Sequence, residues 1–136
     1  MKLLIDTNII LDVLCKREPF FLSSGTVLRL CESGICSGAI SALSVANLMY
    51  IMRKELDPNG IRSVLGTLSL ILEIEDLKSG DLVRAADAGW SDYEDAVQAA
   101  CAERIRADLI ITRNIRDYRA SNVPAVTPDD LLAMQK

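Results

Sequence analysis

The stretch Lys2-Leu3-Leu4-Ile5-Asp6 opens the chain with a short apolar run that stops at an acid. Such a run is too short for a helix and suits a buried parallel strand. A second run, Leu109-Ile110-Ile111-Thr112, is apolar and β-branched, and it predicts the clearest strand in the chain. These two segments therefore predict strands of a parallel sheet.

Helix and strand signals alternate along the rest of the chain. The expected strands are residues 2–5, 36–40, 69–74, 109–112 and 123–126, and the expected helices are residues 7–16, 19–34, 41–54, 57–65, 79–88, 91–106 and 127 onward. Among the helix starts, Thr7 or Asn8 is expected to cap the first helix, and Pro19 is expected in the first turn of the second. Caps are also expected at Ser41, Asp57 and Ser91, and Thr127-Pro128 is expected to open the last helix. Alternating strands and helices predict an α/β fold with a parallel sheet covered on both faces.

Length and composition favour one globular domain over residues 1–136. The hydrophobic share is 50% and the charged share is 25%, which excludes intrinsic disorder. Polar residues interrupt every apolar stretch before the ~20 residues needed to cross a bilayer. The first strand meets Asp6 at once and leaves no room for a secretory signal, so we expect a cytoplasmic protein without a membrane span.

The four cysteines and the absence of histidine restrict the chemistry. Cys15, Cys31, Cys36 and Cys101 show no CxxC spacing and are expected to be small buried hydrophobic residues. Without histidine, a zinc site is improbable, and Ser-His-Asp and Cys-His catalysis are excluded. Carboxylates remain as the main chemical resource.

The net charge of −4 argues against a general nucleic-acid coating protein, but it does not exclude a nucleic-acid enzyme. Five arginines fall within sixteen residues: Arg104, Arg106, Arg113, Arg116 and Arg119. Arginine forks suit phosphate oxygens. An equally weighted alternative is a solvated face in which these arginines pair with Glu103, Asp108 and Asp117.

Three acids are placed to meet at one edge of the predicted sheet. Asp6 ends the first strand, Asp95 lies one turn into the helix before the 109–112 strand, and Asp117 lies just beyond that strand. The carboxyl ends of parallel strands share one edge, where ligands bind. We therefore predict that these three carboxylates lie together, within reach of one or two cations.

Each acid also has a simpler interpretation, which stays open. Asp6 could only cap the first helix. Asp92 and Glu94 fit the first positions of a helix that begins with a capping box, where negative charge is favourable in any case. Asp12 is expected to be a solvated helix residue or a partner of Lys16.

Carboxylates crowded at one edge repel each other unless a cation neutralises them. Hard oxygen ligands select Mg²⁺ or Mn²⁺. A metal held in this way can activate water and stabilise charge on a phosphodiester, so hydrolysis of a nucleic-acid backbone is the predicted chemistry.

Three motifs together resemble the PIN domain family. They are Asp6-Thr7-Asn8-Ile9-Ile10-Leu11-Asp12, Asp92-Tyr93-Glu94-Asp95-Ala96-Val97-Gln98, and Thr112-Arg113-Asn114 followed by Asp117-Tyr118. The likeness spans residue 3 to about residue 126. It implies a three-layer α/β/α fold with a central parallel sheet and a nuclease that uses Mg²⁺ or Mn²⁺ to cleave RNA. Small chains of this family are commonly toxins of VapBC-type pairs, inhibited by a small antitoxin protein and usually homodimeric.

The resemblance also implies roles for single residues. Asp6, Asp95 and Asp117 match the family's metal-binding acids. Asn8, Thr112 and Asn114 match polar residues that support the site, and Asp92 is included with them. Apart from the resemblance, the suitability of arginine for phosphate oxygens makes Arg113, Arg116 and Arg119 the candidate RNA phosphate contacts. Asn47 stands where many members carry a glutamate, so it is included among the catalytic candidates; the alternative is a polar residue that bonds back to its own helix.

The leading hypothesis is therefore a metal-dependent ribonuclease, the toxin of a toxin-antitoxin pair. A non-catalytic PIN-like module that binds RNA or protein is the alternative, which Asn47 and the negative net charge keep open. A phosphatase of the HAD-like type ranks low, because its chemistry requires a second Asp where Asn8 stands.

Overall fold

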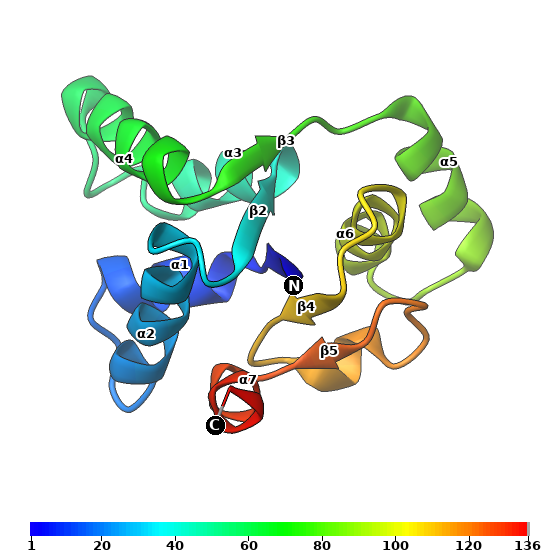
Figure 1. Cartoon of the computed structure of the whole chain (residues 1–136). Coiled ribbons are helices and arrows are strands. Elements are labelled where there is room, and N and C mark those ends of the chain that lie inside the picture. Colours follow the sequence, from blue (N-terminus) through cyan, green and yellow to red (C-terminus); the bar gives the residue numbers. More distant parts are fainter. Residues whose placement is uncertain (136) are drawn as a thin grey trace.

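The computed structural model describes residues 1–135, and its architecture is a parallel sheet wrapped by helices (Figure 1). The strands are β1 (Lys2–Ile5), β2 (Ser37–Ser41), β3 (Glu73–Glu75), β4 (Leu109–Ile111) and β5 (Ala125–Val126). The helices are α1 (Thr7–Leu14), α2 (Phe21–Glu32), α3 (Ala42–Ile51), α4 (Pro58–Ile71), α5 (Ser79–Ala88), α6 (Tyr93–Arg104) and α7 (Pro128–Met134), with a 3-10 helix η1 (Ile115–Tyr118). This confirms the predicted α/β class.

The five strands are all parallel and run in the order β3-β2-β1-β4-β5. β1 is the central strand, with Leu4 opposite Ala39 on β2 and Ile110 on β4. The strand order changes direction at β1, so the crevice between the ends of β1 and β4 is the expected ligand position of an open parallel sheet. Asp6 and Thr112 directly follow these two strands.

The alternation of side chains along β1 separates the core into two layers. Leu3 and Ile5 are fully buried against α1, α2 and α7, in one cluster with residues such as Val27 and Leu131. Leu4 points to the other face, where it packs with Ala102 of α6 and Tyr118 of η1. Helices on both faces explain why β1 and β4 are almost uninterrupted apolar sequence.

Several boundaries differ from the sequence expectations because local caps decide them. Asp6, and not Thr7 or Asn8, is the N-cap of α1, and α1 ends at Leu14. Pro19 precedes α2 instead of lying in its first turn. Asp92, and not Ser91, caps α6. The caps predicted at Ser41, Asp57 and Thr127 are confirmed.

The expected strand at 69–74 was wrong over most of its length. α4 continues to Ile71, and only Glu73–Glu75 forms the edge strand β3. Leu68 and Leu72 are both buried in the main core. Their spacing of four residues is that of a helix and not the two-residue alternation of a strand. Among the cysteines, Cys15 is exposed, contrary to expectation, whereas the other three are buried.

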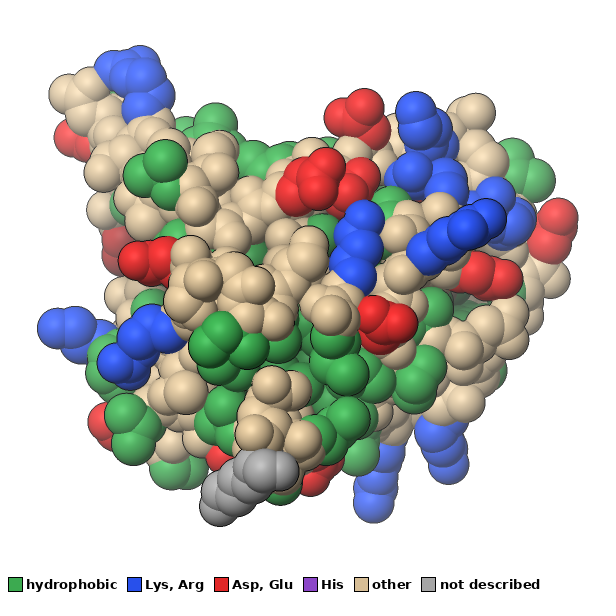
Figure 2. All heavy atoms as spheres, viewed as in Figure 1, with side chains coloured by type: hydrophobic (Ala, Val, Ile, Leu, Met, Phe, Trp, Pro, Cys, Tyr) green, Lys and Arg blue, Asp and Glu red, His purple; other side chains and the backbone are tan. Residues whose placement is uncertain are grey.

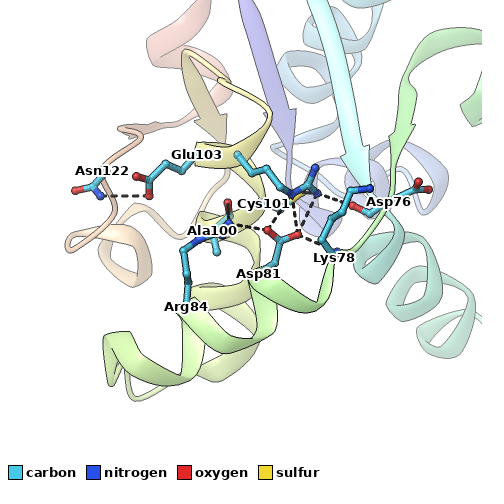
Figure 3. A network of polar contacts seen from close by, with 9 residues as sticks. Asp76, Lys78, Asp81, Arg84, Ala100, Cys101, Glu103 and Asn122 are labelled. Carbon is cyan, nitrogen blue, oxygen red and sulfur yellow. Dashed lines mark hydrogen bonds and ion pairs between the residues drawn. The ribbon is translucent and has the colours of Figure 1, made fainter.

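A buried carboxylate joins α5 to α6 (Figure 3). Asp81 is fully buried and accepts hydrogen bonds from Nε of Arg104 at 2.9 Å and from Nη2 of Arg84 at 2.8 Å. Burial alone would raise the pKa of Asp81, but the hydrogen bonds from Arg104 and from the Lys78 N–H outweigh it and lower that pKa. Arg104 therefore has a structural role, since its guanidinium neutralises a buried acid. Figure 2 shows Lys and Arg side chains on the side of the molecule where α5 and α6 lie, beside acidic groups.

Arg113 has a structural role of the same kind. Asp12 is fully buried, and its Oδ2 accepts hydrogen bonds from Nε of Arg113 and Oγ of Ser24, each at 2.9 Å. The guanidinium of Arg113 also lies 4.1 Å over the ring of Phe20. The expectation that Asp12 is solvated or paired with Lys16 was therefore wrong.

None of the helices in the described part of the chain is both long and apolar enough to traverse a bilayer.

Candidate active site

Asp6 combines two roles at the carboxyl end of β1. Its Oδ1 accepts the N–H of Thr7 at 2.8 Å and so caps α1. Its Oδ2 accepts the hydroxyl of Thr112, at the end of β4, at 2.8 Å, and the amide of Asn8 at 3.4 Å. The capping alternative for Asp6 is therefore correct, but it occupies only one of the two oxygens.

Tyr118 connects Asp6 to Asp95. Its hydroxyl lies 3.4 Å from Oδ2 of Asp6 and 3.3 Å from Oδ1 of Asp95, within hydrogen-bond reach of both. Burial, followed by the two nearby carboxylates, holds the pKa of Tyr118 far above its usual range, so the phenol stays protonated and donates. The fold thus brings a carboxylate from β1 and a carboxylate from α6 to one hydroxyl.

Burial raises the pKa values of both acids, and neighbouring negative charges raise that of Asp95 further. Burial raises the pKa of Asp6 despite the opposing hydrogen bonds from Thr112 and Thr7. Burial also raises the pKa of Asp95 to about 6, and the negative charges of Asp92, Asp6 and Asp117 add to that shift. Mutual repulsion of this kind marks a position where a cation is electrostatically favoured.

A cavity of about 390 Å³ opens beside these two acids. Its polar lining consists of oxygen- and amide-bearing side chains from β1, α1, α3, α6 and the loop after β4: Asp6, Thr7, Asn8, Ser44, Asn47, Tyr50, Glu94, Asp95, Gln98 and Asn114. Because this set contains neither thiol nor imidazole, its chemistry suits a hard cation.

Asn47 lies in this cavity, as the sequence suggested. It projects from α3, and its Nδ2 donates a hydrogen bond to Oε2 of Glu94 on α6 at 3.1 Å. The side chain therefore bonds across the cavity, and its predicted alternative, a bond back to its own helix, is not observed within the described residues. Glu94 was expected only as a first-turn acid, yet it lines the cavity as well.

Asn8, Thr112 and Asn114 form the polar floor between β1 and β4. Nδ2 of Asn8 donates a hydrogen bond to the Thr112 hydroxyl at 3.3 Å, and Oδ1 of the same side chain accepts the backbone N–H of Arg113. The Asn114 N–H donates to the Thr112 hydroxyl at 3.1 Å. These contacts orient Asp6. Asp92 caps α6 by accepting the N–H of Asp95 at 3.1 Å, so it positions the helix start that carries Asp95.

Asp117 lies to one side of this arrangement. It lines a neighbouring hollow of about 600 Å³ together with Asp92, Asp95, Arg116 and Arg119, and it does not line the cavity beside Asp6. Its charge still reaches Asp95, since it contributes to the raised pKa of that acid. Asp95 is the residue that the two hollows share.

Sequence reasoning missed Gln98 and Tyr118 as site residues. Gln98 is buried and bonds to Ser41 at the end of β2 and to Ser44 on α3, at 2.6 Å for the latter. It thereby ties α6 to the second strand end. A signal was present in both cases, because Gln98 and Tyr118 close two of the recognised motifs and are polar groups in apolar, buried surroundings.

The residues fit a hard divalent cation at Asp6 and Asp95. Within residues 1–135, no three His, Cys, Asp or Glu side chains converge closely enough to hold a metal ion by themselves. Mg²⁺ often takes only one or two carboxylates and keeps several waters. Two carboxylates, amide oxygens and an open cavity match that mode; a cage of three acids is not formed in the described part of the chain.

Taken together, a parallel sheet in the order β3-β2-β1-β4-β5 and an acidic cavity at its carboxyl edge define a class of small α/β domain with a carboxylate centre. The family described as PIN domain matches residues 2–116. The chain therefore belongs to the PIN domain family.

Solved structures with the same fold come from bacterial toxin-antitoxin systems. The chain superposes on a toxin-antitoxin complex from Klebsiella pneumoniae with a TM-score of 0.70 and 23% identity, over 92% of this chain and 96% of that one. For VapBC2 from Rickettsia felis, bound to a DNA fragment from the promoter, the TM-score is 0.71 and the identity is 20%, over 93% of this chain and 98% of the VapBC2 chain. For VapBC-1 from Haemophilus influenzae, the TM-score is 0.71 and the identity is 16%, over 95% of this chain and 99% of the VapBC-1 chain. No curated protein sequence is similar enough to count as a match.

Proposed function

We propose that this PIN domain is an endoribonuclease that uses Mg²⁺ or Mn²⁺ to hydrolyse RNA phosphodiester bonds. The observation that carries the proposal is the convergence of Asp6 and Asp95 on the Tyr118 hydroxyl, beside a cavity with a lining of hard oxygen donors. Capping of α1 uses one oxygen of Asp6, and it does not account for a second carboxylate, Asp95, held near the other oxygen through Tyr118.

In this proposal Asp6 and Asp95 hold the cation, with Asn47 and Glu94 as further oxygen donors and Asp117 as a nearby charge. When bound, a divalent cation supplies an activated water and stabilises charge on the phosphate. Thr112 and Asn8 keep Asp6 oriented, and the Tyr118 hydroxyl donates a hydrogen bond to one carboxylate at a time. Because the chain has no histidine, carboxylates are the natural groups to accept the proton of the attacking water.

The experiment compares wild type with Asp6→Asn on a mixture of structured and single-stranded RNA. We expect cleavage with Mn²⁺ or Mg²⁺, complete inhibition by a chelator, and a loss of at least about 100-fold in Asp6→Asn, the scale of a lost catalytic group. Asp87→Asn, an exposed acid of α5, is the matched control and should cleave as wild type does. Chelator-resistant cleavage would contradict the mechanism.

We further propose that the protein is a toxin held inactive by a small antitoxin, and that it acts in the cytoplasm as a homodimer. The support is the fold shared with the toxin-antitoxin complex from Klebsiella pneumoniae and with VapBC2 from Rickettsia felis. Expression of the chain alone should arrest growth, and the Asp6→Asn variant should not. Light scattering of the purified protein measures the oligomeric state, and a monomer would contradict the dimer.

A non-catalytic binding module is the second candidate, favoured by one observation. Within the described residues, no three acids form a preassembled metal cage. A module of this kind would bind RNA or a protein, and Asp6→Asn would leave that binding unchanged. It would cleave no RNA, whichever divalent metal is added.

A further inference from the structure

The hollow on the far side of Asp95 has a composition unlike that of the cavity beside Asp6. It is formed by the turn between α5 and α6 and by η1, and its volume is about 600 Å³. Its lining comprises one aromatic ring, two arginines and three acids, with small residues between them: Ala88, Gly89, Trp90, Ser91, Asp92, Asp95, Arg116, Asp117, Arg119 and Ala120. Of these acids, Asp95 also lines the cavity beside Asp6.

The two arginines of this hollow have no assigned structural task. Among the described residues, Arg116 and Arg119 form neither an ion pair nor a side-chain hydrogen bond, and both are exposed. Arg104 and Arg113, by contrast, are bound to buried acids. The arginine-rich segment therefore divides into members that hold the fold and members that are free to bind a ligand.

Trp90 supplies an apolar surface in the same hollow. Gly89 adopts a left-handed conformation, with φ of 68°, that ends α5 and directs the chain into the turn. Trp90 follows and is half-buried, and its ring meets the Tyr118 ring edge to face at 6.3 Å between centroids. The Tyr118 hydroxyl in turn contacts Asp6 and Asp95. A ligand on Trp90 would thus lie one side chain away from the candidate active site.

We infer that this hollow binds one nucleotide of a single-stranded RNA substrate, with its base against Trp90 and a backbone phosphate on Arg116 and Arg119. Base stacking on an aromatic ring combined with arginine contacts to phosphate is the general chemistry of single-strand binding. The inference rests on the proposed function, since it treats the hollow as the part of the substrate path next to the cleaved bond. An acidic peptide would satisfy the arginines but gain nothing specific from Trp90.

Trp90 is the only tryptophan in the chain, so its fluorescence reports directly on the hollow. Wild type is titrated with a short oligouridylate in the presence of a chelator, which prevents metal-dependent cleavage. We expect saturable quenching of Trp90. Arg116→Ala/Arg119→Ala should weaken binding about tenfold and reduce the slope of log affinity against log salt by about 1.4, since each lost phosphate contact on a single strand removes about 0.7.

The matched control is Arg29→Ala/Arg62→Ala, which removes two exposed arginines from α2 and α4 and should change affinity by less than about twofold. Trp90→Phe, followed by anisotropy of a labelled oligouridylate, should bind more weakly by several-fold while it retains the wild-type salt slope. Circular dichroism verifies that each variant is folded.

Three results would overturn the inference: no quenching in wild type, an equal loss of affinity in both double variants, or equal quenching by a glutamate-rich peptide. The binding test needs no metal and no turnover. If oligouridylate binds as expected but no metal condition yields cleavage, the proposed nuclease function fails and the nucleotide site stands. If cleavage occurs but the arginine pair is without effect, the nucleotide site fails and the nuclease stands.

Discussion

The Nδ2 of Asn47 donates a hydrogen bond to Oε2 of Glu94 at 3.1 Å, across the cavity that also contains Asp6 and Asp95. The two residues come from α3 and α6, and they place a neutral amide against a carboxylate. The amide offers its oxygen to a cation but adds no charge, while Glu94 supplies charge from the opposite helix. This pair makes Asn47 a sensitive position for metal affinity.

Replacement of Asn47 by Glu should raise Mn²⁺ affinity by about tenfold, because hard-cation affinity rises with the number of charged ligands. Asn47→Ala should lower it. Calorimetric titration of Mn²⁺ measures both. Asn59→Glu, which adds the same charge at an exposed position of α4, is the control and should leave affinity unchanged. Equal affinities in wild type, Asn47→Glu and Asn47→Ala would remove Asn47 from the site.

The raised pKa of Asp95 predicts how stability depends on pH. A carboxyl whose pKa is about 6 in the folded protein, above its ordinary value of 3.8, favours the folded state fully below pH 3.8, and this contribution is lost as pH rises to about 6. Asp95→Asn should therefore stabilise the metal-free protein at pH 7.5 by about 1 kcal/mol, after discounting for solvent screening.

The stabilisation should disappear at pH 4, where the wild-type carboxyl is mostly protonated in the folded state. Thermal unfolding at both pH values, with chelator present, measures the difference as a shift of about 3 °C at pH 7.5. A variant that is equally stabilised at both pH values would show that the Asp95 charge is not the cause. Asp87→Asn serves as the exposed control.

The buried pair of Asp12 and Arg113 predicts a large effect from removing one partner. Asp12 is fully buried, and its Oδ1 has no hydrogen-bond partner within the described residues. Arg113→Ala would remove the cation that pairs with this charge among residues 1–135 and should destabilise the protein by about 3 kcal/mol. Asp12→Asn/Arg113→Ala should recover much of that loss. Urea unfolding gives the free energies, and equal losses in the single and double variants would contradict the buried-charge explanation.

Gly38 on β2 lies where a larger residue would clash with neighbouring side chains. A Cβ there would lie 2.5 Å from Cδ2 of Leu72 and 2.6 Å from Sγ of Cys31, so one of them must shift. Gly38→Ala should cost about 2 kcal/mol, the usual scale of overpacking. Gly66→Ala in α4, where a Cβ meets nothing within 4 Å, should instead stabilise by about 0.5–1 kcal/mol. Urea unfolding of both variants tests the contrast.

The class of fold, and several of the residues that line the cavity beside Asp6, could be predicted from the sequence. Short apolar runs that end at Asp6 and Thr112 predict neighbouring strand ends, because the periodicity of buried strands is a local property of the chain. The caps at Ser41 and Asp57 were equally local, since a side-chain oxygen and an N–H three residues away are enough to define them. The motifs around Asp6, Asp95 and Thr112 marked the residues that meet at the carboxyl edge.

Pairings between distant residues depended on the tertiary structure. No local pattern indicates that Asp12 bonds to Arg113, that Asp81 bonds to Arg104 or that Gln98 bonds to Ser44, because each pair forms only when α6 or the loop after β4 docks against another element. The same docking pairs Arg104 and Arg113 with buried acids and leaves Arg116 and Arg119 without an ion pair among the described residues. It also placed Asp117 beside the second hollow instead of the first, since the short η1 helix sets the direction of that side chain after β4 ends. The sequence by itself determined which groups are available to the site. The packing of α6 and η1 against the sheet decided which of them face one another, because contact between residues that are far apart in the chain is a property of the folded core.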